Sequence, residues 1–185
     1  MSVQNPSRLL AALVTVMGLG ACASMGNAPM AFSQTSLPDA VKVPTGHIVA
    51  METVGAGDIT YECRAKKDMA GQFEWVFVGP DARLMNRNGA QIGRYFGPPA
   101  TWENMDGSKI TGAQLAVAPS GAGNIPFQLV KANPAMGSGA MQGVTYIQRV
   151  ATQGGVAPSA PCEASGLGKK QLVKYQADYI FWRAS

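Results

Sequence analysis

The chain has 185 residues and a formal net charge of +4, and only 14% of its residues are charged, against about 25% in an average protein. It contains 22 glycines and 12 prolines, residues that favour turns and interrupt regular elements. This composition excludes a coiled coil, a long helical bundle and a charged disordered chain, and it favours short strands joined by many turns. Because the basic residues are few and dispersed, we expect no nucleic-acid partner.

The first 21 residues have the features of a lipoprotein-type signal peptide. Arg8 precedes an apolar run over residues 9–19, which is too short for an ordinary transmembrane helix. The run ends in Leu19-Gly20-Ala21-Cys22, which resembles a bacterial lipobox, where cleavage leaves an amino-terminal cysteine that carries lipid. We therefore expect a membrane anchor at Cys22. Because the next residue is Ala23 rather than Asp, we expect an outer-membrane lipoprotein of the bacterial cell envelope that faces the periplasm or the surface.

The alternative is cleavage after Ala23 by ordinary signal peptidase, because residues 21–23 also form an A-x-A site. The product would then be soluble, and either secreted or periplasmic. Residues 22–43 show little periodicity and are expected to form a flexible tether, followed by a single domain over residues 44–185.

Two further cysteines, Cys63 and Cys162, are expected to pair in an oxidising compartment. Their separation is 162 − 63 = 99 residues, and closing a loop of that size stabilises a fold by about 4–5 kcal/mol in the chain-entropy model. Two independent buried thiols are the alternative.

The folded part has the alternation of half-buried strands, most clearly over residues 59–63, 73–77 and 173–181. Residues 79–115 are expected to form two consecutive hairpins, each starting at a Gly-Pro corner and each turning at an Asn-Gly or Asp-Gly pair in a type I′ turn. Pro126 would place its strand at a sheet edge. The fold class is therefore predicted to be all-β and antiparallel, a sandwich or a small barrel with consecutive hairpins and one disulfide.

Few catalytic groups are available. The chain has one histidine, His47, and no Gly-x-Ser-x-Gly motif, so a serine or cysteine triad is not expected; no metal site and no cofactor are expected either. Carboxylates remain, and Glu103 with Glu74 or Asp106 could serve a carbohydrate-active enzyme, which needs a pair of acids.

The leading functional hypothesis is a non-enzymatic binding or structural module of the envelope. Its candidate ligand-binding residues are Arg94, Tyr95 and Trp102, which lie in an aromatic-rich segment suited to a glycan or an envelope protein. A periplasmic inhibitor of a secreted hydrolase is a third hypothesis.

Several motifs carry a resemblance to a known family. They are Tyr61-Glu62-Cys63, the run from Phe73 to Pro80, Gly97-Pro98-Pro99-Ala100-Thr101-Trp102, Asp106-Gly107-Ser108, the run from Val144 to Arg149, and the closing run from Tyr175 to Trp182. Together they resemble the domain of unknown function 3455, over about residues 44–183. The resemblance implies an exported protein, and it supplies no catalytic residues.

Overall fold

The computed structural model describes residues 1–2 and 32–185. The predicted signal peptide, its lipobox with Cys22 and the first part of the predicted tether therefore lie outside the described residues. In the part that is described beyond residue 32, the chain forms eight antiparallel strands, and no helix there is long and apolar enough to cross a membrane.

The eight strands form a closed barrel in which each strand pairs with the next one along the chain and the last pairs with the first. The elements in order are η1 (Asp39–Val41), β1 (His47–Ala65), β2 (Phe73–Met85), β3 (Gln91–Phe96), β4 (Thr101–Asn104), β5 (Lys109–Ala118), β6 (Phe127–Ala132), β7 (Val144–Gly154), η2 (Ala164–Gly166) and β8 (Lys170–Ala184). The predicted all-β antiparallel class with consecutive hairpins is confirmed, and of its two forms the structure is the barrel.

The position of β6 in the sheet differs from the edge position that was expected. The strand is hydrogen-bonded to β5 on one side and to β7 on the other, so it is not an edge strand. Pro126 lies just before the first residue of β6, where its missing N–H is not needed by the ladder.

Side chains from alternate positions of every strand fill the barrel interior. An eight-stranded barrel is just wide enough for such packing, and glycine makes room where a ring is large. A Cβ on Gly55 would lie 2.5 Å from Cε2 of Tyr179, so β1 can pass this ring only because the position has no side chain.

The two predicted hairpin turns have a different geometry from the one expected. In residues 86–89 and 104–107 only the glycines, Gly89 and Gly107, have positive φ, at 81° and 87°. A type I′ turn needs two such residues in succession, so that prediction is wrong. Instead Asn86 and Asn104 open each turn, and their Oδ1 atoms accept hydrogen bonds from backbone N–H groups two residues on, as in an Asx-turn.

The two Gly-Pro pairs also differ from each other. Gly97-Pro98 lies between β3 and β4, as a corner should, whereas Gly79-Pro80 lies inside β2. β2 continues past this pair with a bulge: Thr60 pairs with Gly79 and Tyr61 with Phe77, so Val78 of β2 is the extra residue.

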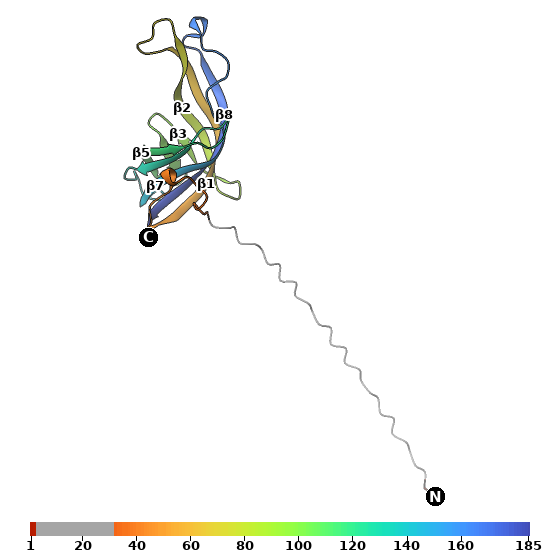
Figure 1. Ribbon diagram of the computed structural model, residues 1–185. Helices are drawn as coiled ribbons and strands as arrows, with labels where there is room; N and C mark the ends of the chain where they lie inside the picture. Colours follow the sequence, from red (N-terminus) through yellow and green to blue (C-terminus); the bar gives the residue numbers. More distant parts are fainter. Residues whose placement is uncertain (3–31) are drawn as a thin grey trace. The chain divides into compact units, whose positions relative to one another are not determined.

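Three strands run on beyond the barrel at one end, as Figure 1 shows for β2 and β8. This arm consists of residues 60–65 of β1, 73–79 of β2 and 170–173 of β8, which pair with one another. The predicted disulfide is confirmed there: Cys63 and Cys162 are bonded, with their Cα atoms 5.4 Å apart. It ties the loop over residues 155–169 to the arm, and the Trp75 indole N–H donates to the Ala160 carbonyl of that loop at 2.8 Å.

The segment over residues 32–43 packs on the outer face of the barrel, where a flexible tether was expected. Val41 and Val43 are buried in an apolar cluster with residues of the strands beneath, Leu129, Val150, Ile180 and Trp182 among them. Unlike a tether, this segment belongs to the folded unit.

A buried amide fixes that segment to the barrel. The side chain of Gln148 is fully buried, and its Nε2 donates to the Val41 carbonyl at 2.6 Å and to Oε1 of Gln34 at 3.0 Å. Its Oε1 accepts from the Trp182 indole N–H at 2.8 Å. The amide is thereby satisfied at both ends, as a buried polar group must be.

Candidate ligand-binding site

Two of the three predicted binding residues belong to the barrel core. The exposed fractions of Tyr95 and Trp102 are 5% and 1%. Their rings stack with centroids 4.6 Å apart, and both contact the ring of Tyr179 at 5.0 and 5.9 Å. The indole N–H of Trp102 has no hydrogen-bond partner among the described residues. Trp102 therefore contributes apolar packing inside the barrel and offers no exposed surface to a ligand.

The third, Arg94, lies on the outer face. Its Nε donates to Oε2 of Glu103 at 2.6 Å, and its guanidinium lies 4.5 Å from the ring centroid of Phe96. Arg94 and Glu103 are also opposite each other in the pairing of β3 with β4. Glu103, the leading acid of the enzyme hypothesis, thus has a cross-strand ion-pair role that accounts for it.

Glu74 is far from Glu103 along the sheet. Arg83 of β2 is paired with Arg94, the partner of Glu103, and Glu74 is nine residues further along β2 (83 − 74). At about 3.3 Å per residue this is roughly 30 Å of strand, whereas the two acids of a glycosidase lie about 5–9.5 Å apart. The strand register therefore does not bring these two carboxylates together.

Asp106 has a structural role at the opposite end of the barrel from the arm. Its Oδ1 accepts hydrogen bonds from the backbone N–H and the hydroxyl of Ser108, and its Oδ2 accepts from the backbone N–H of Ala140 at 2.7 Å. These bonds lower the pKa of the Asp106 carboxyl, with the Ser108 hydroxyl as the largest cause. A catalytic acid needs a raised pKa, so Asp106 is suited to closing the barrel and unsuited to acid catalysis.

This end is filled by side chains. Met141, from the loop that Asp106 holds, is fully buried within the core, and Ile110 and Leu84 are buried with it. The filled part of the interior extends from the contact between Trp102 and Tyr179 to the turn that Asp106 closes, and we call it the packed end.

The arm end of the barrel is hollow. A partly enclosed cavity of about 360 Å³ opens there, within the usual range for small-molecule sites; we call it the mouth. Its walls are largely apolar, with a few polar groups. The lining residues are Ile59, Tyr61, Phe77, Pro80, Tyr95, Gly97, Pro98, Ala100, Gln114, Ile125, Pro126, Gln128 and Arg149.

The mouth is formed by inward-facing side chains of the barrel strands and by the arm. Ile59 and Tyr61 follow each other on the inward phase of β1, and Phe77 faces Tyr61 from β2. The two rings meet edge to face with centroids 6.1 Å apart. Phe77 is still 53% exposed, so the arm presents a large apolar ring to solvent at the lip of the cavity.

Arg149 is the charged residue of the mouth. It follows the buried Ile147 by two positions on β7, which places it on the inward phase of that strand. Its Nε and Nη2 donate to the carbonyl of Pro126 at 3.2 and 3.0 Å. The aromatic hydroxyls around it are kept neutral: burial raises the pKa of Tyr61 and of Tyr95, while the positive charge of Arg149 acts in the opposite direction.

Arg149 is not among the binding residues predicted from the sequence. Arg149 lies two positions after the apolar Ile147 on its strand, and this spacing would place both side chains on one face. Val150, on the other face, is also apolar, so both faces of the strand carry apolar residues. The inward face of β7 could therefore not be chosen from alternation.

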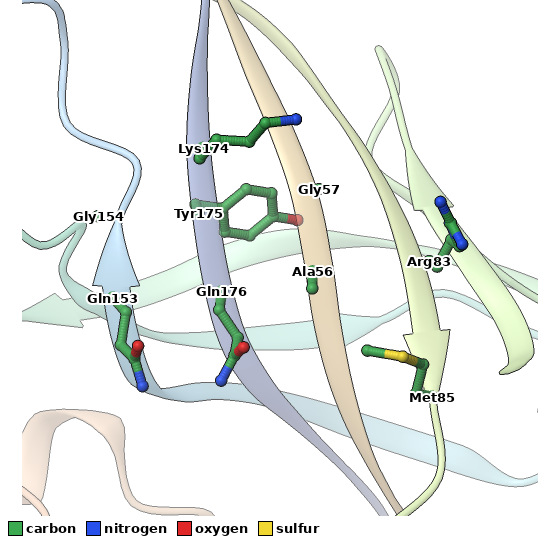
Figure 2. A pocket seen from close by; sticks show the side chains of 9 residues that line it. All are labelled: Ala56, Gly57, Arg83, Met85, Gln153, Gly154, Lys174, Tyr175 and Gln176. Atoms are coloured by element: carbon green, nitrogen blue, oxygen red, sulfur yellow. The ribbon is translucent and has the colours of Figure 1, made fainter. Parts of the chain in front are cut away.

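A second depression lies on the outer face, across β2, β1, β8 and β7. It is larger, at about 620 Å³, but open, and its side chains are mostly polar. In Figure 2 Gln153 and Gln176 lie on one side of Ala56, with Arg83 and Met85 on the other. This outer groove encloses a ligand less completely than the mouth does, and one of its cations, Lys174, is already paired with Asp58 at 2.9 Å.

These features define a class: a small closed barrel of sequential antiparallel strands, packed at one end and hollow at the other. The chain belongs to the family described as Protein of unknown function (DUF3455), whose sequence profile matches residues 44–183. No curated protein and no solved structure matches the chain.

Proposed function

We propose that this protein is a non-enzymatic binding protein of the bacterial cell envelope that holds a small, largely apolar ligand in the mouth of its barrel. The observation that carries the proposal is the partly enclosed cavity with Tyr61, Phe77 and Tyr95 in its walls and Arg149 as its charged group. A concave, mostly apolar pocket with a few polar groups is the usual form of a small-molecule site.

The envelope location rests on the export signal and on the disulfide. An intramolecular disulfide such as Cys63–Cys162 persists in oxidising compartments and is rare in the cytosol. The lipobox-like sequence at Cys22 supports an anchor in the outer membrane. Replacing Cys22 with Ala should move the protein from the membrane fraction to the soluble periplasmic fraction, and continued membrane retention of the variant would contradict the anchor.

Binding in the mouth can be tested with a neutral fluorescent probe, N-phenyl-1-naphthylamine. We expect saturable binding to the wild type, with enhanced emission as the probe leaves water. Gln114 is exposed at the rim of the mouth, so a Gln114→Trp substitution should fill the opening without disturbing the core, and it should weaken probe binding at least tenfold.

The matched control is Gln153→Trp, an equal substitution at an exposed position of the outer groove. This variant should bind the probe as the wild type does. Absence of saturable binding to the wild type, or equal loss in both variants, would contradict a ligand site in the mouth.

A further inference from the structure

The guanidinium of Arg149 is held in one orientation and is only partly used. Two of its nitrogens, Nε and Nη2, donate to one acceptor, the carbonyl of Pro126. A guanidinium has five N–H donors, and among the described residues no hydrogen bond from Nη1 is formed. Donors therefore remain on the end of the group that the Pro126 carbonyl does not occupy.

The charge of Arg149 is not balanced by a neighbour. None of the ion pairs between described residues includes it. The nearby ionisable groups inside the barrel are tyrosines, and burial raises the pKa values of Tyr175 and Tyr179 as it does those of Tyr61 and Tyr95. A phenol with a raised pKa is neutral at physiological pH, so it supplies no negative charge.

The rest of the mouth is largely apolar, and its two amide side chains bond to each other, the Gln128 amide donating to Oε1 of Gln114 at 2.6 Å. Tyr61 and Tyr95 contribute aromatic rings to its walls, and Pro80, Pro98 and Pro126 have no backbone N–H to offer a ligand. The Tyr61 hydroxyl is already committed to the Gly155 carbonyl, at 2.8 Å. The cavity thus pairs one fixed cation with largely apolar walls.

Resting on the proposed function, we infer that the ligand of the mouth is a small organic anion with a flat or compact apolar body and a carboxylate, which ion-pairs with Arg149 while the body lies between the aromatic and proline walls. A carboxylate matches the planar fork of a guanidinium. Burial of the ligand's apolar surface against these walls provides affinity, and the positive charge of Arg149 provides selectivity for an anion.

The test compares 2-naphthoate with 2-naphthamide, which share a ring system and differ in charge. Calorimetric titration of the wild type should give a dissociation constant for 2-naphthoate at least tenfold lower than that for 2-naphthamide. Arg149→Met removes the charge but keeps an unbranched side chain, and it should abolish this preference, so that the two dissociation constants agree within about twofold.

Two further variants complete the design. Arg149→Lys keeps a cation and should retain part of the preference for 2-naphthoate, and it decides the matter if thermal melting shows that Arg149→Met is unfolded. Arg83→Met removes an exposed arginine of the outer groove and should leave both affinities unchanged.

Equal affinity of the wild type for both compounds, or an undiminished preference in Arg149→Met, would overturn the inference about charge and leave the neutral-probe site in place. Loss of the preference in Arg83→Met instead would move the anion site to the outer groove. Failure of both compounds to bind the wild type would overturn the inference together with the proposed function.

Discussion

The two ends of one barrel are built from the same strands and differ in what fills them. At the packed end, Met141 and Ile110 occupy the interior, and Asp106 ties the loop that brings Met141 to the turn before β5. At the mouth, three strands continue as the arm, and the interior ends in a cavity of about 360 Å³ with a partly exposed Phe77 at its lip. The comparison indicates that side-chain packing closes one end, whereas at the other end the Cys63–Cys162 disulfide holds the arm and the interior is left open to a ligand.

The largest effect should come from the aromatic contact between the two ends. Trp102→Ala removes a ring that is 1% exposed and stacked on Tyr95, and such truncations cost about 3–5 kcal/mol. Denaturant unfolding should show this loss in the free energy of unfolding. A variant with wild-type stability would contradict the core position of Trp102 and return it to the ligand-binding surface that the sequence suggests.

At the packed end, Asp106→Asn should lower the melting temperature at neutral pH, because an NH₂ replaces one carboxylate oxygen and so either Ser108 or Ala140 loses its acceptor. The pKa of Asp106 is lowered in the folded state, so its stabilising contribution is complete above the unfolded pKa of about 3.9. It declines as the pH falls through the folded pKa.

The difference in melting temperature between wild type and Asp106→Asn should therefore be largest near pH 7 and should shrink below about pH 4. A difference that is constant over this range would show that the carboxylate charge is not what holds the loop.

The smallest effect on stability is expected at the lip of the mouth. Phe77→Ala removes a ring that is 53% exposed, and its cost should stay below about 1 kcal/mol, since exposed substitutions are usually mild. The same variant should weaken binding of N-phenyl-1-naphthylamine, because the ring lines the cavity. Equal stability losses in Phe77→Ala and Trp102→Ala would remove the contrast between the ends.

The strands could be predicted from the sequence because alternation is a local pattern. The disulfide could be predicted because few pairings of the cysteines are possible. Alternation marked β1, β2 and β8, and only two cysteines remained to pair. The choice between a barrel and a sandwich could not be made, because it depends on whether all eight strands pair in one continuous ring, which alternation within single strands does not determine. The outer packing of residues 32–43 had one signal, the run Tyr179-Ile180-Phe181-Trp182, in which both faces of the strand are apolar.

The candidate site was less predictable than the fold. Arg94, Tyr95 and Trp102 are adjacent in the predicted meander, but strand alternation places Arg94 outside and Tyr95 inside, and the pairing of β3 with β4 buries Trp102 against Tyr95. Tyr95 does line the mouth, although it contributes a core ring and not an exposed platform. Arg149 comes from a strand that is remote in sequence, so only closure of the barrel brings it to the cavity.

A crystal structure of the protein with 2-naphthoate tests ligand binding in the mouth most directly. It should show the naphthyl ring in the mouth, between Tyr61 and the proline walls, with the carboxylate within hydrogen-bonding distance of Arg149 and the packed end unchanged. A ligand in the outer groove, or one in the mouth with its carboxylate turned away from Arg149, would contradict the account.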